Sequence, residues 1–262
     1  MALRGRNRNP DVVAAVVDRG ILIRCWPGVD VVAAVVDRGR IVPGSILAGV
    51  GDPGYNGGVL TYETFCGGIF ETNCYAISAP QGWILFDAPE GTCEWLESRE
   101  VDLRLLLLTH GHIDHVQDVA KIKRRFGCQI GCHPLTAPMI SDREFFRNFG
   151  FELEIEPAEP DFFVEETPIQ NFLGLELQVL EVPGHCPGSL CFFSRKDELL
   201  IGGDVLFAGG VGRWDLPGGD GELLFGGIKE KLFPLGDKVT VLPGHGPPTT
   251  IGTERRTNRF VE

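Results

Sequence analysis

The segment THGHIDH at 109–115 contains four side chains of the kinds that bind metal ions within six consecutive residues: His110, His112, Asp114 and His115. The apolar run Leu103–Leu108 precedes them directly and predicts a buried strand. A turn after this strand would let His110 and His112 converge, and would place Asp114 and His115 in the first turn of a helix, where the helix dipole favours a carboxylate. Burying these polar groups together without a ligand would be costly. The segment therefore predicts a metal site.

Three further polar residues follow apolar runs in the same way. His185 follows the motif Pro-Gly, Asp204 follows Gly-Gly, and His245 follows Pro-Gly. Each lies just beyond the carboxyl end of a predicted strand, where open sheets build their sites, and the glycines allow tight turns there. Imidazole and carboxylate groups, with no obvious thiolate among them, suit zinc or iron and are harder to reconcile with magnesium.

These motifs resemble those of the metallo-β-lactamase superfamily, whose signature is THxHxDH. PGH at 183–185, GGD at 202–204 and LPGH at 242–245 match the later family motifs in order. The resemblance covers nearly all of residues 59–262 and is especially close to the small bacterial glyoxalase II type. TNCY at 72–75 and the segments 203–220 and 242–258 support that placement.

The resemblance implies an α/β fold, an αββα sandwich of two mixed sheets flanked by helices. It also implies a pair of metals, two Zn²⁺ or alternatively iron. His110, His112 and His185 would hold the first metal, Asp114, His115 and His245 the second, and Asp204 would bridge them.

The expected activity is hydrolysis of a thioester such as S-lactoylglutathione. Two metals lower the pKa of a shared water to give a bridging hydroxide, and they stabilise the oxyanion formed on attack. Asp114 would orient that hydroxide, and Arg213 would contact an anionic carboxylate of glutathione. Two departures from glyoxalase II proteins concern the substrate. Asp215 stands where those proteins often have an aromatic residue, and only 17 residues follow His245, where they have a helical glutathione-binding domain.

The main alternative is a mononuclear iron persulfide dioxygenase, in which His110, His185 and Asp204 alone would bind iron. The segment 242–251 resembles the hydrolase branch and argues against it. A scaffold without catalysis is disfavoured because every ligand position is filled. A β-lactamase role is weak because its substrate-binding loops cannot be identified, and RNA processing generally needs an inserted domain.

The composition of the chain limits the classes of partner and the cellular compartment that are expected for it. The chain has 262 residues with a net charge of −12, which argues against a nucleic-acid partner. No apolar run approaches the length of a membrane span, and the start does not resemble a signal peptide. Eight cysteines at irregular spacings, without a CxxC pair, predict free thiols in a reducing, cytoplasmic compartment.

Residues 1–58 differ from the catalytic domain predicted over 59–262. They contain DVVAAVVDRG twice, at 11–20 and 30–39. The repeat is compatible with a pair of strands, but we favour a duplication without function or a misassigned start, in an extension that need not be ordered. The segment GVGDPG at 49–54 matches the dinucleotide-binding pattern, yet the proline and glycines that follow cannot propagate a helix, so we interpret it as a turn.

The remaining elements are expected from periodicity and turn residues. Predicted strands are 74–78, 83–87, 103–108, 129–132, 175–182, 190–194, 198–201 and 238–242, and predicted helices are 92–99, 113–126, 135–148 and 221–232. Residues 152–166 read as a surface connection. His133 is interpreted as the end of a strand rather than a ligand beside Cys128 and Cys132, and Cys186 as support for its loop. Arg255 and Arg256 are expected in a solvated tail.

Overall fold

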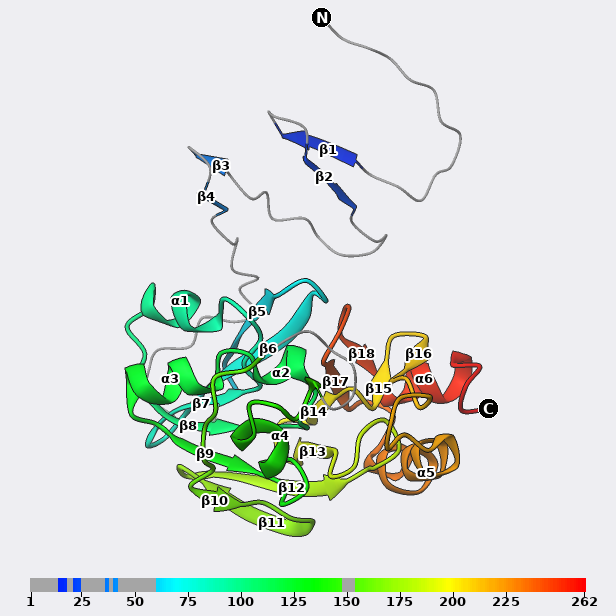
Figure 1. Cartoon of the computed structure of the whole chain (residues 1–262). Coiled ribbons are helices and arrows are strands. Elements are labelled where there is room, and N and C mark those ends of the chain that lie inside the picture. Colours follow the sequence, from blue (N-terminus) through cyan, green and yellow to red (C-terminus); the bar gives the residue numbers. More distant parts are fainter. Residues whose placement is uncertain (1–13, 18–20, 25–35, 38–39, 42–59, 148–153) are drawn as a thin grey trace, which may run out of the picture. The chain divides into compact units, whose positions relative to one another are not determined.

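The computed structural model describes residues 60–147 and 154–262 in full, and the backbone of four short strands before them. The chain separates into two units, Met1–Val50 and Gly51–Glu262. In the first unit (Figure 1), β1 (Ala14–Val17) pairs with β2 (Ile21–Arg24) and β3 (Val36–Asp37) with β4 (Arg40–Ile41). Each copy of the repeat thus supplies a strand that pairs with the segment after it, not with the other copy.

Two predictions for this region concern residues outside the described part of the chain. These are the turn at 49–54 and the boundary between residues 58 and 59. The expectation that residues 1–58 are poorly ordered also concerns mostly residues outside the described part of the chain. The turn, the boundary and the expected lack of order therefore stay predictions.

The first large sheet of the second unit combines antiparallel and parallel strands in the order β10-β9-β8-β7-β6-β5. Its strands are β5 (Tyr62–Gly67), β6 (Thr72–Ala79), β7 (Gly82–Phe86), β8 (Leu103–Leu107), β9 (Gln129–Cys132) and β10 (Phe162–Phe163). The hairpins β5–β6 and β6–β7 are antiparallel, whereas β7 to β10 run parallel. Parallel neighbours bring the carboxyl ends of β7, β8 and β9 to one edge.

The second large sheet has the order β11-β12-β13-β14-β17-β18 and is also mixed. It contains β11 (Thr167–Phe172), β12 (Leu175–Glu181), β13 (Leu190–Ser194), β14 (Leu199–Gly203), β17 (Thr240–Pro243) and β18 (Thr249–Thr250). Only the β14–β17 pairing is parallel. A small hairpin, β15 (Leu206–Phe207) and β16 (Gly210–Val211), follows β14.

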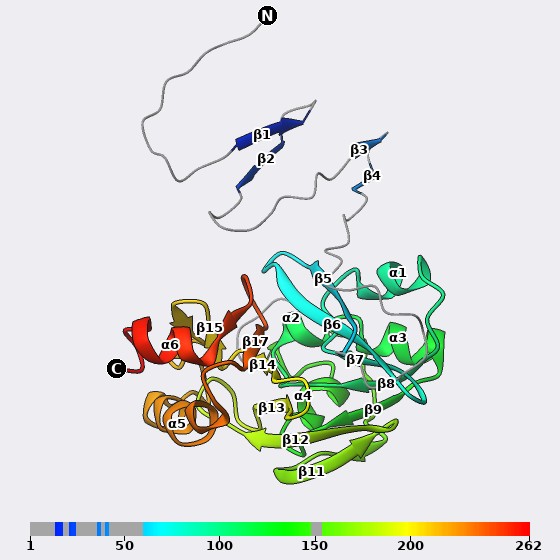
Figure 2. The same ribbon diagram turned by 180° about the vertical axis from the view of Figure 1, so that it is seen from behind.

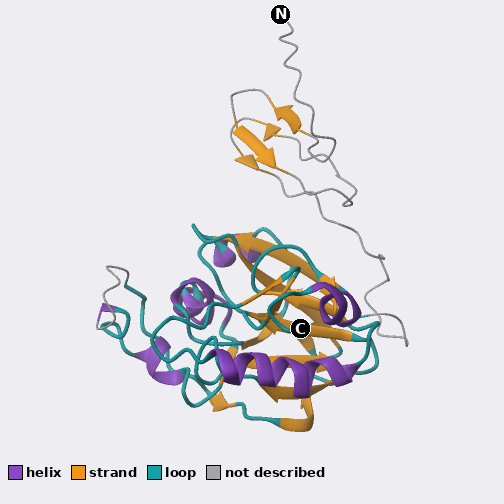
Figure 3. Cartoon of the chain, turned by 90° about the vertical axis from the view of Figure 1, so that its right-hand side faces the viewer, coloured by secondary structure: helices purple, strands orange, loops and turns teal. Residues whose placement is uncertain are grey.

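Helices cover the outer face of each sheet, as the front and back views show (Figures 1 and 2). The helices after the first-sheet strands are α1 (Thr92–Glu97), α2 (Ile113–Val116), α3 (Val119–Phe126) and α4 (Ala137–Ser141). Those of the second sheet are α5 (Gly221–Gly227), which continues as a π-helix (Ile228–Leu232) and a 3₁₀ turn (Phe233–Leu235), and α6 (Ile251–Thr257). Seen from the side, α5 and its π-helical continuation form one helix that lies over the second sheet (Figure 3).

Burial divides the interior into three apolar layers, which confirms the predicted αββα sandwich. Leu106 on β8 and Leu108 just after it pack toward the helices, whereas Leu105 and Leu107 of β8 pack between the sheets in the same layer as Phe192. A third layer lies between the second sheet and α5 and α6. This alternation follows from the two-residue period of a strand with both faces buried. No helix in the described ranges has the length and apolar character needed to cross a membrane.

Several predicted element boundaries were wrong. The helix expected over 113–126 is broken between α2 and α3, and the one over 135–148 shortens to α4, because Asp142 takes an extended conformation. The connection 152–166 contains β10, which pairs with β9. Strands β5 and β11 and helix α6 were not expected.

The C-terminal arginines also differ from the prediction. Arg255 and Arg256 lie in the last turn of α6, where both form ion pairs with Asp237. They therefore belong to a folded helix end and not to a solvated tail.

Candidate metal centre

The seven predicted ligands lie beyond the carboxyl ends of strands, in loops and in one short helix that meet at one edge of the sandwich. His110 and His112 follow β8, and Asp114 and His115 lie in α2; His185, Asp204 and His245 follow β12, β14 and β17. Four ligands thus come from the first sheet and three from the second.

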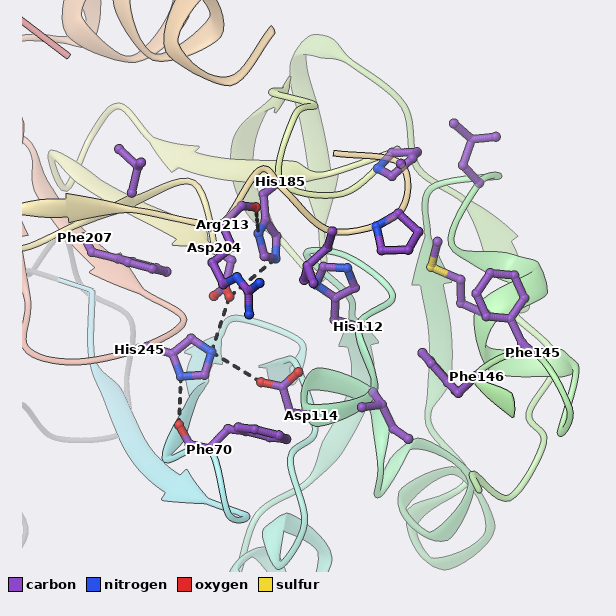
Figure 4. A pocket seen from close by; sticks show the side chains of 18 residues that line it. Phe70, His112, Asp114, Phe145, Phe146, His185, Asp204, Phe207, Arg213 and His245 are labelled. Atoms are coloured by element: carbon purple, nitrogen blue, oxygen red, sulfur yellow. Dashed lines mark hydrogen bonds and ion pairs between the residues drawn. The ribbon is translucent and has the colours of Figure 1, made fainter. Parts of the chain in front are cut away.

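The side chains of His112, Asp114, His185, Asp204 and His245 point toward one another beside the cavity (Figure 4). Behind them, the ring of His110 lies 4.1 Å from that of His115 and 4.9 Å from that of His185, between centroids. The rings of His112 and His185 are 4.4 Å apart. Asp204 reaches both sides of the cluster, with its carboxylate oxygens 3.3 Å from His115 Nε2 and 3.5 Å from His185 Nε2.

His245 completes the cluster at its other end. Its Nε2 lies 3.3 Å from Asp114 Oδ2 and 3.3 Å from Asp204 Oδ2. Three groups of ligand atoms fall within 4.8 Å of one another: His110, His112 and His185; Asp114, His115 and His245; and His110, His115 and Asp204. The first two groups are the predicted metal sets, and the third joins Asp204 to one histidine of each.

Four of the five clustered histidines are held through Nδ1, which leaves Nε2 facing the centre. His115 Nδ1 contacts Asp87 Oδ2 at 2.8 Å, His185 Nδ1 the carbonyl oxygen of Arg213 at 2.7 Å, and His245 Nδ1 that of Phe70 at 3.0 Å. Since these oxygens only accept, each Nδ1 carries the proton. Nε2 is then the atom available to a metal.

His110 reaches the same tautomer through Thr109. The Thr109 hydroxyl donates to Asp87 Oδ2 at 2.7 Å, so its oxygen accepts from His110 Nδ1 at 3.0 Å. The backbone N–H of Thr109 also donates to Asp87 Oδ1. Asp87 therefore orients two of the predicted ligands, one directly and one through Thr109.

The residues fit a metal centre by a direct structural criterion. The Nε2 atoms of His110, His115 and His185 and the Oδ1 atom of Asp204 are buried and have no hydrogen-bond partner among the described residues. Buried polar atoms without partners are rare in folded proteins. Four of them, aimed into one space and all able to donate an electron pair, match the donor set of a zinc or iron site.

The cluster shifts the pKa values of its side chains, downward for some and upward for others. Burial lowers the pKa of His112 to about 4 and that of His110 well below its usual value. Asp204, with Asp114 and Asp87, raises the pKa of His115 despite its burial. The charge of His115 in turn outweighs burial and lowers the pKa of Asp114 to about 2. The carboxylates are thus ionised, as metal ligands must be.

Close packing around Asp204 explains two of the glycines. A side chain on Gly244 would collide with Asp204 Oδ1, and one on Gly212 with the carbonyl oxygen of the same aspartate. Glycine at both positions lets the loop after β17 and the loop after β16 approach the cluster.

The loop that carries His245 is held by the first sheet. The side-chain amide of Asn73 donates to the carbonyl oxygens of Pro243 at 3.1 Å and Gly246 at 2.9 Å, and the hydroxyl of Tyr75 donates to Pro243 at 2.7 Å. The hydroxyl of Thr72 donates to Asp114 Oδ2 at 2.8 Å. The segment TNCY, noted in the sequence only for its resemblance, thus connects the two sheets at the cluster.

The residues set aside in the sequence do not join the groups of converging ligand atoms. His133 follows β9 as predicted, and its Nδ1 accepts from the backbone N–H of Leu135, while Nε2 is 3.6 Å from Glu181. Cys186 is fully buried beside His185, and burial raises the pKa of its thiol to about 11. Neither belongs to a ligand group among the described residues. All seven cysteines described are free thiols.

Arg213 lies at the rim of the same site but is already paired. Its Nε and Nη2 atoms donate to the two carboxylate oxygens of Asp215, each at 2.9 Å, and both side chains are exposed. This hydrogen bonding lowers the pKa of Asp215 and raises that of Arg213.

Two supporting residues were missed in the sequence. Asp87 was seen only as the end of a predicted strand, although an aspartate after a buried run of apolar residues is the same signal that identified Asp204. Thr72 carries no such signal, because its role depends on the hairpin that brings β6 beside α2.

A cavity of about 670 Å³ opens over the cluster. It is lined by His112, Asp114, His185, Asp204 and His245, and by mostly apolar side chains from both halves of the second unit. The metal centre therefore lies inside a space large enough for a small-molecule substrate.

Comparison with known proteins agrees with this geometry. The family model of the metallo-beta-lactamase superfamily matches residues 67–245. The chain is 37% identical to hydroxyacylglutathione hydrolase GloC of Haemophilus influenzae over 199 residues, which is 73% of this chain and 93% of that protein.

Two solved structures are similar in both fold and sequence. The BLEG-1 B3 metallo-beta-lactamase superimposes with a TM-score of 0.71 at 31% identity, covering 77% of this chain and 99% of that one. TTHA1623, solved in a di-iron-bound form, superimposes with a TM-score of 0.67 at 36% identity, covering 75% and 98%.

Proposed function

This chain belongs to the metallo-β-lactamase superfamily, and from that premise we propose that it is a metal-dependent hydrolase that cleaves a small-molecule thioester, with S-lactoylglutathione as the reference substrate. The observation that carries the proposal is the set of buried, unpartnered Nε2 atoms of His110, His115 and His185 around Asp204. The similarity to hydroxyacylglutathione hydrolase GloC supports the choice of reference substrate.

In this proposal His110, His112 and His185 would hold one metal, Asp114, His115 and His245 would hold the other, and Asp204 would be shared between them. Divalent metals at such a site lower the pKa of water toward neutrality and polarise a carbonyl oxygen. We propose that the site binds two zinc ions. Iron is the alternative metal, and the di-iron-bound form of the similar protein TTHA1623 supports that alternative.

The chain's own residues supply orientation. Asp87, the Arg213 carbonyl and the Phe70 carbonyl each accept a hydrogen bond from Nδ1 of one histidine, so that Nε2 is the ring atom that faces the centre and would bind a metal. Such supporting contacts fix ring orientation and raise the basicity of the ligand. Asp114, whose carboxylate accepts from the Thr72 hydroxyl, would orient the attacking water in this proposal.

The test is metal analysis of the purified protein together with S-lactoylglutathione hydrolysis. We expect two zinc ions per chain and turnover that is lost in His110→Ala. One iron per chain, with oxygen consumption on glutathione persulfide and no thioester cleavage, would instead establish the persulfide dioxygenase alternative. The presence of Asp114, His115 and His245 in the cluster favours the hydrolase, because a mononuclear site would need only His110, His185 and Asp204.

We also propose a reducing, cytoplasmic location. The support is that the seven described cysteines are unpaired, six of them buried, which is expected where thiols are kept reduced.

A further inference from the structure

One side of the cavity is a continuous apolar surface. We call Leu135, Met139, Phe145 and Phe146 the apolar wall; they come from α4 and its flanking turns and line the cavity beside Ile113. In Figure 4 the labelled Phe145 and Phe146 stand on the opposite side of the metal cluster from His245. A substrate whose reacting carbonyl lies at the cluster would therefore extend toward this wall.

The cavity offers little to an anionic partner. Apart from the histidines, Arg213 is the one cationic side chain among the described residues that line it. Two nitrogen atoms of its guanidinium already donate to Asp215. Glutathione carries two carboxylates, so the surface beyond the metal ligands complements its charges poorly.

The apolar wall is accessible as well as apolar. Leu135 is 53% exposed and lines the cavity. Phe146, by contrast, is 4% exposed and anchors the wall in the layer beneath the first sheet. A rigid apolar base with an exposed leucine at its edge matches the apolar surfaces that line small-molecule sites.

We propose that the preferred substrate is a thioester with an aliphatic or aromatic acyl group that lies against the apolar wall. This inference rests on the proposed function and narrows its substrate class. Hydrolysis adds one water: the C–S bond breaks, a C–O bond forms, the acyl group leaves as the acid, and the remaining proton goes to the thiol. S-lactoylglutathione, with a short polar acyl group, is then accepted but is not the best substrate.

The first measurement is kcat/KM of the metal-loaded enzyme on S-lactoyl, S-butanoyl, S-hexanoyl and S-octanoylglutathione. Each methylene buried against the wall is expected to raise kcat/KM by about two- to fourfold, until the chain outgrows the cavity. Equal values across the series, or a preference for the lactoyl group, would overturn the inference and leave the proposed function intact.

A matched pair of variants tests whether the preference for longer acyl groups depends on the apolar wall. Leu135→Ser removes an exposed leucine of the wall, and Leu223→Ser removes one of nearly equal exposure, 54%, on α5 outside the cavity. We expect Leu135→Ser to lower kcat/KM for the octanoyl compound about three- to tenfold and to lower that for the lactoyl compound by a smaller factor. Leu223→Ser should change neither. Equal effects of the two variants on the octanoyl compound would overturn the assignment.

A binding measurement separates this inference from the proposed function. S-methyl and S-hexylglutathione are thioethers and cannot be hydrolysed, so their affinities for the metal-loaded protein are measured by calorimetry without turnover. Tighter binding of the hexyl compound by tenfold or more, lost in Leu135→Ser, supports the apolar wall even if no thioester is cleaved. Equal affinities, or no measurable binding of the hexyl compound, would overturn it even if S-lactoylglutathione is cleaved.

Discussion

Asp87 offers the sharpest test of how the protein prepares its metal ligands. The aspartate is 2% exposed and accepts three hydrogen bonds, from the Thr109 backbone N–H at 2.8 Å, the Thr109 hydroxyl at 2.7 Å and His115 Nδ1 at 2.8 Å. Asp87→Asn keeps the size of the side chain but replaces one accepting oxygen by a donating NH₂ group. That group must then face at least one of the three donors.

Two relaxations are open to the variant, and each has a cost. If a donor loses its acceptor, the metal-free protein loses about 1–3 kcal/mol of unfolding free energy. If His115 instead accepts from the new amide, its proton moves to Nε2, the atom that a metal needs. Loss of such supporting contacts typically weakens metal binding 10- to 100-fold, or about 1.4–2.7 kcal/mol.

Asp118→Asn is the matched control. Asp118 is 1% exposed and its carboxylate accepts from the backbone N–H groups of Gly91 and Cys93, both at 3.0 Å, and pairs with Lys121 at 2.9 Å. None of these partners is a predicted ligand. The control should therefore lose comparable stability while binding metal with unchanged affinity.

The assay combines urea denaturation of the metal-free proteins with zinc competition against a chromophoric chelator. We expect both variants to unfold at lower urea and only Asp87→Asn to lose zinc affinity. Unchanged zinc affinity in Asp87→Asn, or an equal loss in Asp118→Asn, would refute the argument that Asp87 acts by fixing the tautomer of its histidine.

Four further outcomes are expected. Asp215→Asn releases the Arg213 guanidinium for a substrate carboxylate, so the KM for S-lactoylglutathione should fall about two- to fivefold, as for an exposed pair; an unchanged KM in steady-state kinetics would count against that role for the arginine. His133→Ala should leave both the metal content and the hydrolysis rate within twofold, measured by elemental analysis and the thioester assay. Although burial alone would lower it, hydrogen bonding to the two carboxylates raises the pKa of His245 to about 10. Metal must therefore displace a proton at neutral pH, so affinity should rise with pH toward 10, and the apparent binding enthalpy should depend on the ionisation enthalpy of the buffer. Removal of residues 1–58 should leave the hydrolysis rate unchanged, because every proposed ligand lies later in the chain.

The convergence of these side chains could be expected from the sequence, because His185, Asp204 and His245 each follow a buried apolar strand through a turn that contains glycine, and residues 110–115 follow β8 closely. The pattern depends on local features alone, so it is visible without the fold. Strands β8, β9, β12 and β13 contain the buried apolar residues on which the prediction rested, and their bounds agree with it to within one residue. In β5, by contrast, polar and apolar residues mix at the sheet edge, and only its pairing with β6 defines it.

The break between α2 and α3 could not be predicted from the local sequence. Residues 113–126 have helical periodicity throughout, but the Asp118 carboxylate turns away to accept from Gly91 and Cys93 at the start of α1. This contact spans some 25 residues of chain and outweighs helix propensity at one position. The apolar wall was likewise invisible, since leucine, methionine and phenylalanine near a helix are ordinary core residues until the cavity beside them is seen.

The division of the ligands between the two sheets has a consequence for assembly. Neither proposed metal set is complete on one sheet: His185 must join His110 and His112, and His245 must join Asp114 and His115. The clamp from Asn73 and Tyr75 onto Pro243 forms only when the sheets have docked in register. During synthesis, the emerging first sheet would therefore present only an incomplete chelator: the first set waits for His185 and the second for His245. A metal bound to either set would then crosslink the two sheets of the sandwich.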